Sequence, residues 1–242
     1  MTGSAQLTAP IKTPLNRPPT LPISWASERT FTQSGDTTPL TTVSERCLEG
    51  RSLAILGGGP NLTGPIGQAL AYNRAIAVNN SYLFFHKPCI VVALDRRWWA
   101  WHGNQMRSLG HVGVVALLPK QVPPVGFTGL SFRKERDSTY NPNGGVLCGQ
   151  NSGHAAITLA MHMGASRIYL AGFDMGFVGS QTHWHGGHAV PASSANYERR
   201  FRPALEQLVR DAKALDCHIT SVTPTHADIP MTSIHDAIED LR

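Results

Sequence analysis

From residue 51 onward, short runs of apolar residues alternate with stretches of helical periodicity. The most compact run, at residues 53–56, ends abruptly at three glycines and a proline. Similar runs stand at residues 75–78, 89–94, 112–117, 167–171 and 218–222. Runs rich in Val, Ile and Ala are typical of strands that are buried on both faces. The alternation therefore predicts an α/β fold, with a mostly parallel sheet and helices on both of its faces.

The segments between these runs supply the helices. Helices are predicted over residues 65–73, 98–109, 152–163 and 196–215, whereas residues 120–149, with many Gly and Pro, are predicted to be rich in loops. In the last helix the apolar side chains recur at the 3.6-residue period. These side chains are Tyr197, Phe201, Leu205, Leu208, Val209 and Ala212. We therefore expect one face of this helix to pack against the sheet.

The first 48 residues have a different character. They are rich in Pro, Thr and Ser and show neither a helical nor an alternating pattern. Such a segment buries too little apolar surface to offset the entropy lost on ordering. We predict an extended arm over residues 1–48, anchored by Trp25 and Phe31, and a single Rossmann-like domain over residues 49–242. A length of 242 residues fits one domain with such an appendage.

Composition excludes several classes of protein. With 41% hydrophobic and 15% charged residues, the chain is neither disordered throughout nor a coiled coil. No apolar run approaches the roughly 20 residues of a membrane span, and the N-terminus lacks a secretory pattern. The cysteines are Cys47, Cys89, Cys148 and Cys217, without a CxxC pair. We therefore expect a cytoplasmic protein with free thiols, no transmembrane segment and no cysteine zinc site. Its oligomeric state stays open, a homo-oligomer included.

The net charge of +5 is modest for a chain of this size. Basic residues gather at residues 96–97, 133–136 and 199–202. Such clusters are either solvated surface or contacts to phosphate groups. Nucleic acid, an anionic nucleotide and simple solubility all remain explanations of the charge.

Ligands of parallel sheets bind beyond the carboxyl ends of the strands, and the first such end carries a glycine turn. It consists of Gly57, Gly58, Gly59, Pro60 and Asn61. Glycines allow backbone N–H groups to approach a phosphate closely. The spacing matches neither GxGxxG nor a P-loop, so either a phosphate-binding turn or a plain tight turn is consistent with it.

Polar residues follow the later strands as well. Asn79 and Asn80 stand after the second run, where their amides would contact a sugar or base edge or would cap the next segment. Asp95 closes the third run, suited to a ribose hydroxyl, a divalent metal or a neighbouring arginine. Ser152 and Gly153 open a helix; Ser152 is a good N-cap, and the helix N-terminus favours an anion.

Residues 172–188 hold the most unusual pattern. Asp174 ends a strand, and His183, His185 and His188 then fall within six positions. Histidine is the side chain best suited to exchange a proton near pH 7. Because no cysteine or carboxylate joins the three histidines locally, a catalytic role is favoured over a metal site, and no metal ligand is predicted. A polar loop is the remaining interpretation. The candidate catalytic residues are His183, His185, His188 and Asp174.

Taken in order, these features resemble the bacterial sialyltransferases of glycosyltransferase family 42. The resemblance covers residues 51–225 and is most specific over residues 152–174, where Ser-Gly enters a helix and a strand ends at Gly-Phe-Asp. It implies a Rossmann-like domain with a short lid loop that transfers a sugar from a CMP-sugar with inversion and without metal. The same elements resemble, more weakly, the archaeal 6-hydroxymethylpterin diphosphokinases.

The resemblance also implies roles for individual residues. The glycine turn and Asn79 would hold the nucleotide, Ser152 would lie near the donor, and His188 would be the general base. The chain departs from the family where Gly58 and Asp95 replace asparagines and where the two lid tyrosines are missing. For the missing tyrosines, Thr182, His183, Trp184 and His185 are the candidate substitutes.

Three functions follow from these observations. The first is a glycosyltransferase whose nucleotide-sugar donor is CMP-linked or of another kind. Its acceptor would be a glycan, a small molecule or, in a phage-type system that modifies DNA, a hydroxymethylated DNA base. The second is a diphosphokinase that acts on a hydroxymethyl group with ATP and Mg²⁺, for which Asp95 and Asp174 are suited. The third is a nucleotide-binding module without catalytic activity.

Overall fold

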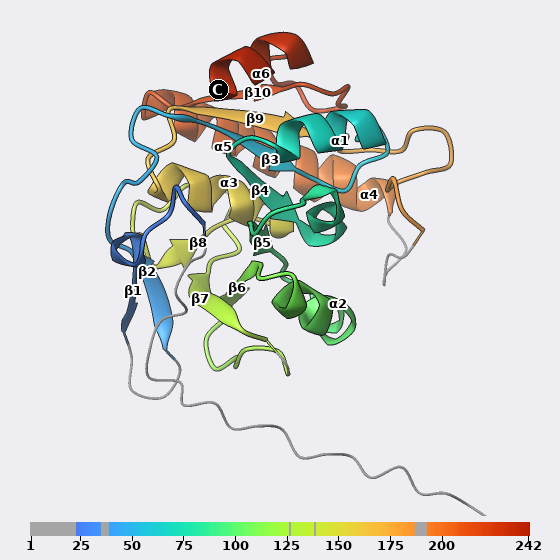
Figure 1. Ribbon diagram of the computed structural model, residues 1–242. Helices are drawn as coiled ribbons and strands as arrows, with labels where there is room; N and C mark the ends of the chain where they lie inside the picture. Colours follow the sequence, from blue (N-terminus) through green and yellow to red (C-terminus); the bar gives the residue numbers. More distant parts are fainter. Residues whose placement is uncertain (1–22, 35–38, 126, 138, 187–192) are drawn as a thin grey trace, which may run out of the picture.

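The computed structural model describes residues 23–34, 39–125, 127–137, 139–186 and 193–242. Its centre is an eight-stranded sheet in the order β10-β9-β3-β4-β5-β6-β7-β8, and every neighbouring pair is parallel. Figure 1 shows the sheet running from β10, beside the C-terminal helix, down to β6 and β7. The predicted α/β fold with a parallel sheet is confirmed.

The order of the strands creates one switch point. The chain runs outward from β3 (Ser52–Leu56) through β4 (Ala75–Val78), β5 (Ile90–Val92), β6 (Val112–Leu117), β7 (Gly129–Lys134) and β8 (Val146–Leu147). It then returns to place β9 (Arg167–Ala171) on the other side of β3, with β10 (His218–Ser221) beyond it. Connections leave β3 and β9 in opposite directions, so a crevice opens between their carboxyl ends.

Helices cover both faces of the sheet, as the sequence predicts. On one face lie α3 (Ser152–His162) and α5 (Arg202–Ala214); on the other lie α1 (Gly64–Ala71), α2 (Arg96–Ser108) and α6 (Ile234–Leu241). Strand β3 contributes side chains to the hydrophobic cores on both faces of the sheet. Leu53 and Ile55 join the first core, whereas Ala54 and Leu56 join the second. Successive side chains of a strand point to opposite faces, so a fully apolar strand fills both cores.

The predicted long helix is present but irregular. It comprises α4 (Ser194–Asn196), a π-helical turn η3 (Tyr197–Phe201) and α5. The amide of Arg202 donates to the carbonyl of Tyr197, five residues earlier. Pro203 follows and has no N–H, so the regular ladder cannot continue through it. Leu205, Leu208 and Ala212 are buried on the sheet, as expected from their period.

The described part of the predicted arm contains two strands that the pattern does not predict. A 3₁₀ turn, η1 (Glu28–Thr30), leads into β1 (Phe31–Ser34), which pairs antiparallel with β2 (Leu40–Val43). Phe31 is buried and meets Phe132 edge-on at 6.4 Å, while Trp25 packs partly buried against the same core. The strands are short and mostly polar, so burial against β7 and not periodicity defines them.

The prediction that residues 120–149 are rich in loops misses two strands, β7 and β8, and holds for the other described residues. Leu130 and Phe132 of β7 are fully buried, and the strand pairs with β6 along its whole length. Gly129 begins it with a φ of +150°, where a Cβ would lie 2.1 Å from the Gly113 carbonyl oxygen. The glycine that resembled a loop signal therefore permits a close approach of two strands.

Three smaller features complete the fold. The segment after β4 forms a 3₁₀ helix, η2 (Asn79–Phe84), which the sequence pattern does not predict. The four cysteines are free, as expected. Within the described part of the chain, no helix combines the length and the apolar character that a membrane crossing demands.

Candidate functional site

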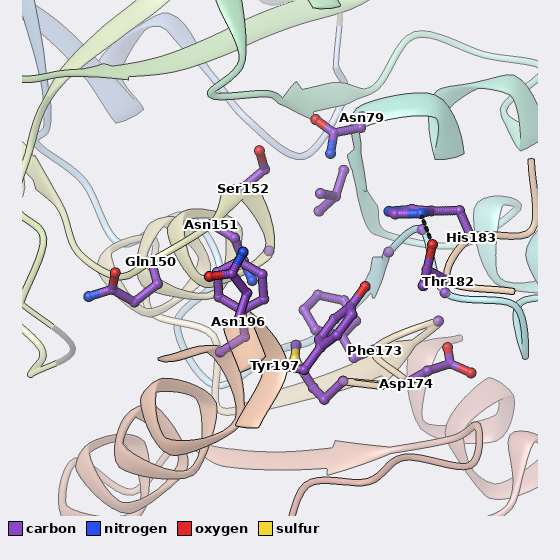
Figure 2. Close-up of a pocket in the computed structure, with 18 of the residues that line it drawn as sticks. Asn79, Gln150, Asn151, Ser152, Phe173, Asp174, Thr182, His183, Asn196 and Tyr197 are labelled. Atoms are coloured by element: carbon purple, nitrogen blue, oxygen red, sulfur yellow. Dashed lines mark hydrogen bonds between the residues drawn. The ribbon is translucent and has the colours of Figure 1, made fainter. Parts of the chain in front are cut away.

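A cavity of about 470 Å³ opens at the switch point, beyond the carboxyl ends of β3 and β9. It brings together most of the predicted site residues, which are Gly57, Gly58, Gly59, Asn79, Asp95, Ser152, Gly153, Asp174, His183 and His185. Figure 2 shows Asn79, Ser152, His183 and Tyr197 around its centre. Pro60, Asn61 and Asn80 stand close by without lining it, and His188 lies outside the described residues.

The glycine turn is packed against β9, and this changes its predicted role. The amides of Gly57 and Gly59 donate to the carbonyls of Ala171 and Gly172, at 2.7 and 2.8 Å. Those two N–H groups therefore donate within the protein and are not available to a phosphate. A Cβ on Gly57 would lie 2.4 Å from the Gly172 oxygen, so the glycine is required for the close approach of two backbones.

Asp174 anchors this turn from below. It is 2% exposed, and its Oδ1 accepts a hydrogen bond from the amide of Asn61 at 3.0 Å. Burial raises the pKa of Asp174 above its usual range, although the Asn61 amide opposes the shift. A Cβ on Gly59 would stand 1.8 Å from Asp174 Oδ2. Figure 2 shows the carboxyl directed away from Ser152 and Asn79. Its Oδ1 holds the turn, whereas its Oδ2 is buried and has no hydrogen-bond partner among the described residues.

Asn79 is held in a strained conformation at the other side of the cavity. Its φ is +51°, in the left-handed region that asparagine tolerates better than most residues. Its Oδ1 is buried and has no hydrogen-bond partner among the described residues. A buried acceptor of this kind is costly unless a ligand or water satisfies it. Asn79 therefore offers an amide oxygen for a hydroxyl or amino group of a ligand.

The N-terminus of α3 faces the cavity, but the capping residue is Asn151. Its side chain accepts from the amide of His154 at 3.0 Å. The prediction of Ser152 as the N-cap is wrong by one position. Ser152 instead accepts a hydrogen bond from the Leu94 amide at 3.0 Å, which ties α3 to the end of β5. Ser152 and Gly153 both line the cavity at the positive end of the helix dipole.

Asp95 has the structural role that the sequence left open. It is the N-cap of α2 and accepts from the Arg97 amide at 2.8 Å. Its second oxygen lies 3.5 Å from the Arg97 guanidinium. Pairing with Arg97 is thus the alternative that the structure shows, and Asp95 also forms part of the cavity rim.

The histidine segment is fixed to the rest of the site by its neighbours. The amide of Trp184 donates to the Gly58 carbonyl at 3.1 Å, and the Trp184 ring packs on Phe84 at 4.8 Å. His183 Nδ1 lies 3.0 Å from the Thr182 hydroxyl (Figure 2). His185 Nδ1 lies 3.3 Å from Nδ2 of the Asn80 side chain. Two imidazoles thereby line the cavity beside the glycine turn.

Several residues that line the cavity were not identified as site residues from the sequence. Lys134 ends β7, Gln150 precedes α3, and Asn196, Tyr197 and Phe201 belong to the helix before α5. Periodicity places Tyr197 and Phe201 on an apolar face, which does not reveal that this face turns toward the cavity. The signal for Lys134 was its basic cluster, whose two interpretations the sequence could not separate.

Two basic clusters that are distant in sequence meet at Lys134. Burial lowers the pKa of Lys134, and the positive charges of Arg136 and Arg200 lower it further. Arg200 also donates to the Gln150 side chain at 2.9 Å. A half-buried ammonium group beside two guanidinium groups creates a positive potential at this end of the cavity. Among the described residues, no group of three or more His, Cys, Asp or Glu is arranged for a metal ion.

Comparison with known proteins adds no relative. No family model, no curated protein and no solved structure matches this chain. The argument for function therefore rests on the residues of the cavity.

Proposed function

We propose that this chain is a glycosyltransferase that takes a sugar from a nucleotide-activated donor to an acceptor hydroxyl. The observation that carries the proposal is a cavity at the switch point with a positive end and a neutral polar end. Its volume of about 470 Å³ falls among those of small-molecule sites, which cover roughly 300–1,000 Å³. The resemblance to family 42 sialyltransferases suggests the reaction.

The phosphate of the donor belongs at the positive end. Lys134 lines the cavity there, together with Ser152 and Gly153 in the first turn of α3. The dipole of an eleven-residue helix and a nearby ammonium group both favour an anion. The glycine turn is a poorer choice, because the amides of Gly57 and Gly59 already donate to β9.

The sugar or the base belongs at the neutral end. Asn79 offers its unpartnered Oδ1, and Tyr197 brings a hydroxyl toward the centre of the cavity (Figure 2). Burial and the charge of Asp174 raise the pKa of Tyr197, so its hydroxyl stays protonated at neutral pH. Tyr197 is therefore suited to donate a hydrogen bond to the ligand.

The acceptor hydroxyl must lose a proton as it attacks the anomeric carbon. In the family resemblance this proton goes to His188, and the described histidines of the same segment lie at the cavity. Replacing His188 by alanine should lower turnover by about a hundredfold or more, the usual effect of losing a general base. Unchanged function in that variant would favour a module without catalytic activity.

The Mg²⁺-dependent diphosphokinase is the second candidate, and the carboxylates weigh against it. Asp95 caps the first turn of α2 and pairs with Arg97, and one oxygen of Asp174 accepts from the Asn61 amide. Neither carboxylate combines with others into a cluster in the described structure. Binding of Mg²⁺ would require Asp95 and Asp174 to move, whereas the glycosyltransferase proposal does not.

Thermal stabilisation by nucleotides is the direct test. The protein is unfolded with CMP, CDP, UDP, GDP or ATP, each with and without Mg²⁺. A ligand at a hundredfold excess over its dissociation constant stabilises the folded state by about 2.7 kcal/mol. Stabilisation by a pyrimidine nucleotide without metal supports the glycosyltransferase. Stabilisation by ATP only with Mg²⁺ supports the diphosphokinase, and the absence of any effect contradicts both.

A DNA acceptor has its own test, motivated by the basic residues Arg136 and Arg200 beside the cavity. Binding to duplex DNA is measured across a salt series. Contacts to phosphates release counterions, so the affinity should fall steeply as salt rises. Absent binding, or an affinity that ignores salt, would exclude DNA and leave a glycan or a small molecule as acceptor.

A further inference from the structure

A second cavity, of about 420 Å³, lies at the same edge of the sheet as the first. It is found at the carboxyl ends of β5 and β6, where α2 begins. Leu94 and Asp95 line both cavities, so the two adjoin each other after β5. Ligands of parallel sheets bind beyond such strand ends, and a transferase needs room for two substrates. With the donor in the first cavity, the second is the place for the acceptor.

The lining of the second cavity is apolar in one part and basic in another. Val115, Ala116 and Leu117, the last three residues of β6, supply the apolar part. Arg96 and Arg97, in the first turn of α2, supply two guanidinium groups. These arginines form the basic cluster at residues 96–97, which has no part in the first cavity. Apolar surface with a few polar groups is typical of small-molecule sites.

Both guanidinium groups have N–H donors left for a ligand. Arg96 uses one of its five donors within the described part of the chain, through Nη1, which donates to the Val122 carbonyl at 3.0 Å. Arg97 Nη2 lies 3.5 Å from Asp95 Oδ2, and both side chains are exposed. Exposed ion pairs are weak, so a ligand can compete with Asp95 for Arg97. Two positive charges against one negative charge leave the cavity with a positive balance.

We infer that the second cavity is the acceptor subsite and that it takes a sugar with a carboxylate or phosphate group, which Arg96 and Arg97 bind. The inference rests on the proposed function, in which the first cavity holds the donor. A guanidinium binds either anion through two parallel hydrogen bonds. A nucleic acid offers phosphates as well, but a row of basic residues on an open surface would suit its backbone better than a cavity of this size.

Three sugars that share one ring separate the effect of charge from that of shape. Glucose is neutral, glucuronate has a carboxylate, and glucose 6-phosphate has a phosphate. Each is titrated into the full ¹⁵N-labelled chain, with saturating CMP and again without nucleotide. NMR follows the backbone amide signals of Val115, Ala116 and Leu117. The anionic sugars should shift these signals, and the better of the two should bind about tenfold more tightly than glucose.

Substitutions of the charged residues should change this affinity in opposite directions. Arg96→Gln and Arg97→Gln should each weaken the better anionic sugar about threefold to tenfold and leave glucose unchanged. Asp95→Asn removes the competing carboxylate but keeps a capping oxygen, so this sugar should bind more tightly. A merely structural role of the arginines would not produce that gain. Arg107→Gln, which makes the same change in the last turn of α2, is the matched control and should have no effect.

Equal affinity for glucose and the anionic sugars overturns the inference, and so does binding that both arginine variants leave unchanged. A short single-stranded oligothymidylate tests the nucleic acid. If it shifts the same signals at lower concentrations than the anionic sugars, a nucleic acid and not a sugar is the ligand. If no nucleotide binds while the anionic sugars still shift these signals, the proposed function is contradicted and the anion site stands.

Discussion

The cavity has two walls of different character. One, which we call the backbone wall, consists of Gly57, Gly58, Gly59, Gly172 and Asp174. The other, which we call the side-chain wall, consists of Lys134, Gln150, Asn196, Tyr197 and Phe201. In the backbone wall the main chains of β3 and β9 touch, and the amides of Gly57 and Gly59 donate to β9. Asp174 Oδ2 is buried there without a hydrogen-bond partner among the described residues. In the side-chain wall the residues are half-buried. Figure 2 shows Gln150 on the side away from Asp174 and Thr182.

The difference separates two tasks. The backbone wall has no room for a Cβ at Gly57, Gly59 or Gly172, so these residues should matter mainly for stability. The side-chain wall carries the ammonium group of Lys134 and the hydroxyl of Tyr197, so its residues should matter mainly for the ligand. Substitutions in the two walls should therefore have different effects on folding and on binding.

The largest effect is expected in the backbone wall, from Gly59→Ala. The new Cβ would lie 1.8 Å from Asp174 Oδ2 and 2.8 Å from the Gly172 oxygen. Overpacking of this kind costs about 3 kcal/mol of the free energy of unfolding, which chemical denaturation measures. Gly64→Ala is the control, because nothing lies within 4 Å of its Cβ. Equal stability of the two variants would show that the walls do not differ as described.

The second effect is a pH dependence of stability, caused by a buried histidine next to the side-chain wall. Burial lowers the pKa of His154 to about 3, and its Nδ1 accepts from the Gln150 amide. Between pH 6.5 and 3 the His154 imidazole is protonated in the unfolded chain but stays neutral in the folded chain. The free energy of unfolding therefore falls as the pH falls through this window. The loss is about 1.4 kcal/mol per pH unit.

The check is the pH dependence of the unfolding free energy in His154→Asn. Asparagine keeps an acceptor near the place of Nδ1 and cannot titrate. Its stability should fall less steeply than that of the unchanged protein from pH 6.5 to 4.5. Parallel curves would show that His154 becomes protonated without cost in the folded state.

The third effect is on binding alone. Lys134→Gln removes the positive charge from the side-chain wall and should weaken the best nucleotide of the panel about tenfold, the loss of one charge-assisted hydrogen bond. The free energy of unfolding without ligand should hardly change, because burial already disfavours the charged form. Lys213→Gln, on the exposed side of α5, is the matched control. A loss of stability without a loss of affinity would assign Lys134 a structural role.

The smallest effect tests whether Asp95 serves the helix or the ligand. Asp95→Ala removes the N-cap of α2 and should cost about 1 kcal/mol, whereas Asp95→Asn keeps a capping oxygen and should cost little. Nucleotide stabilisation without Mg²⁺ should be the same in both. If Asp95→Asn abolished a Mg²⁺-dependent stabilisation by ATP, the diphosphokinase would be the better proposal.

The sequence alone predicted the strands and helices that have strong periodicity. The runs at residues 75–78, 112–117 and 167–171 coincide with β4, β6 and β9. It also pointed to the strand ends where the cavity lies, because parallel strands bring their carboxyl ends to one edge. Periodicity reports burial, and a run buried on both faces leaves a distinct local signal.

Only the tertiary structure decided which groups are engaged and which face the cavity. The partner of the Asn61 amide is Asp174, at a sequence separation of 113 residues, and no local pattern reveals such a pair. Lys134 reaches the cavity because β7 lies beside β6 in register, and β1 and β2 exist because β7 buries them. These positions follow from strand order and packing, which long-range contacts fix, and a local window of sequence does not contain them.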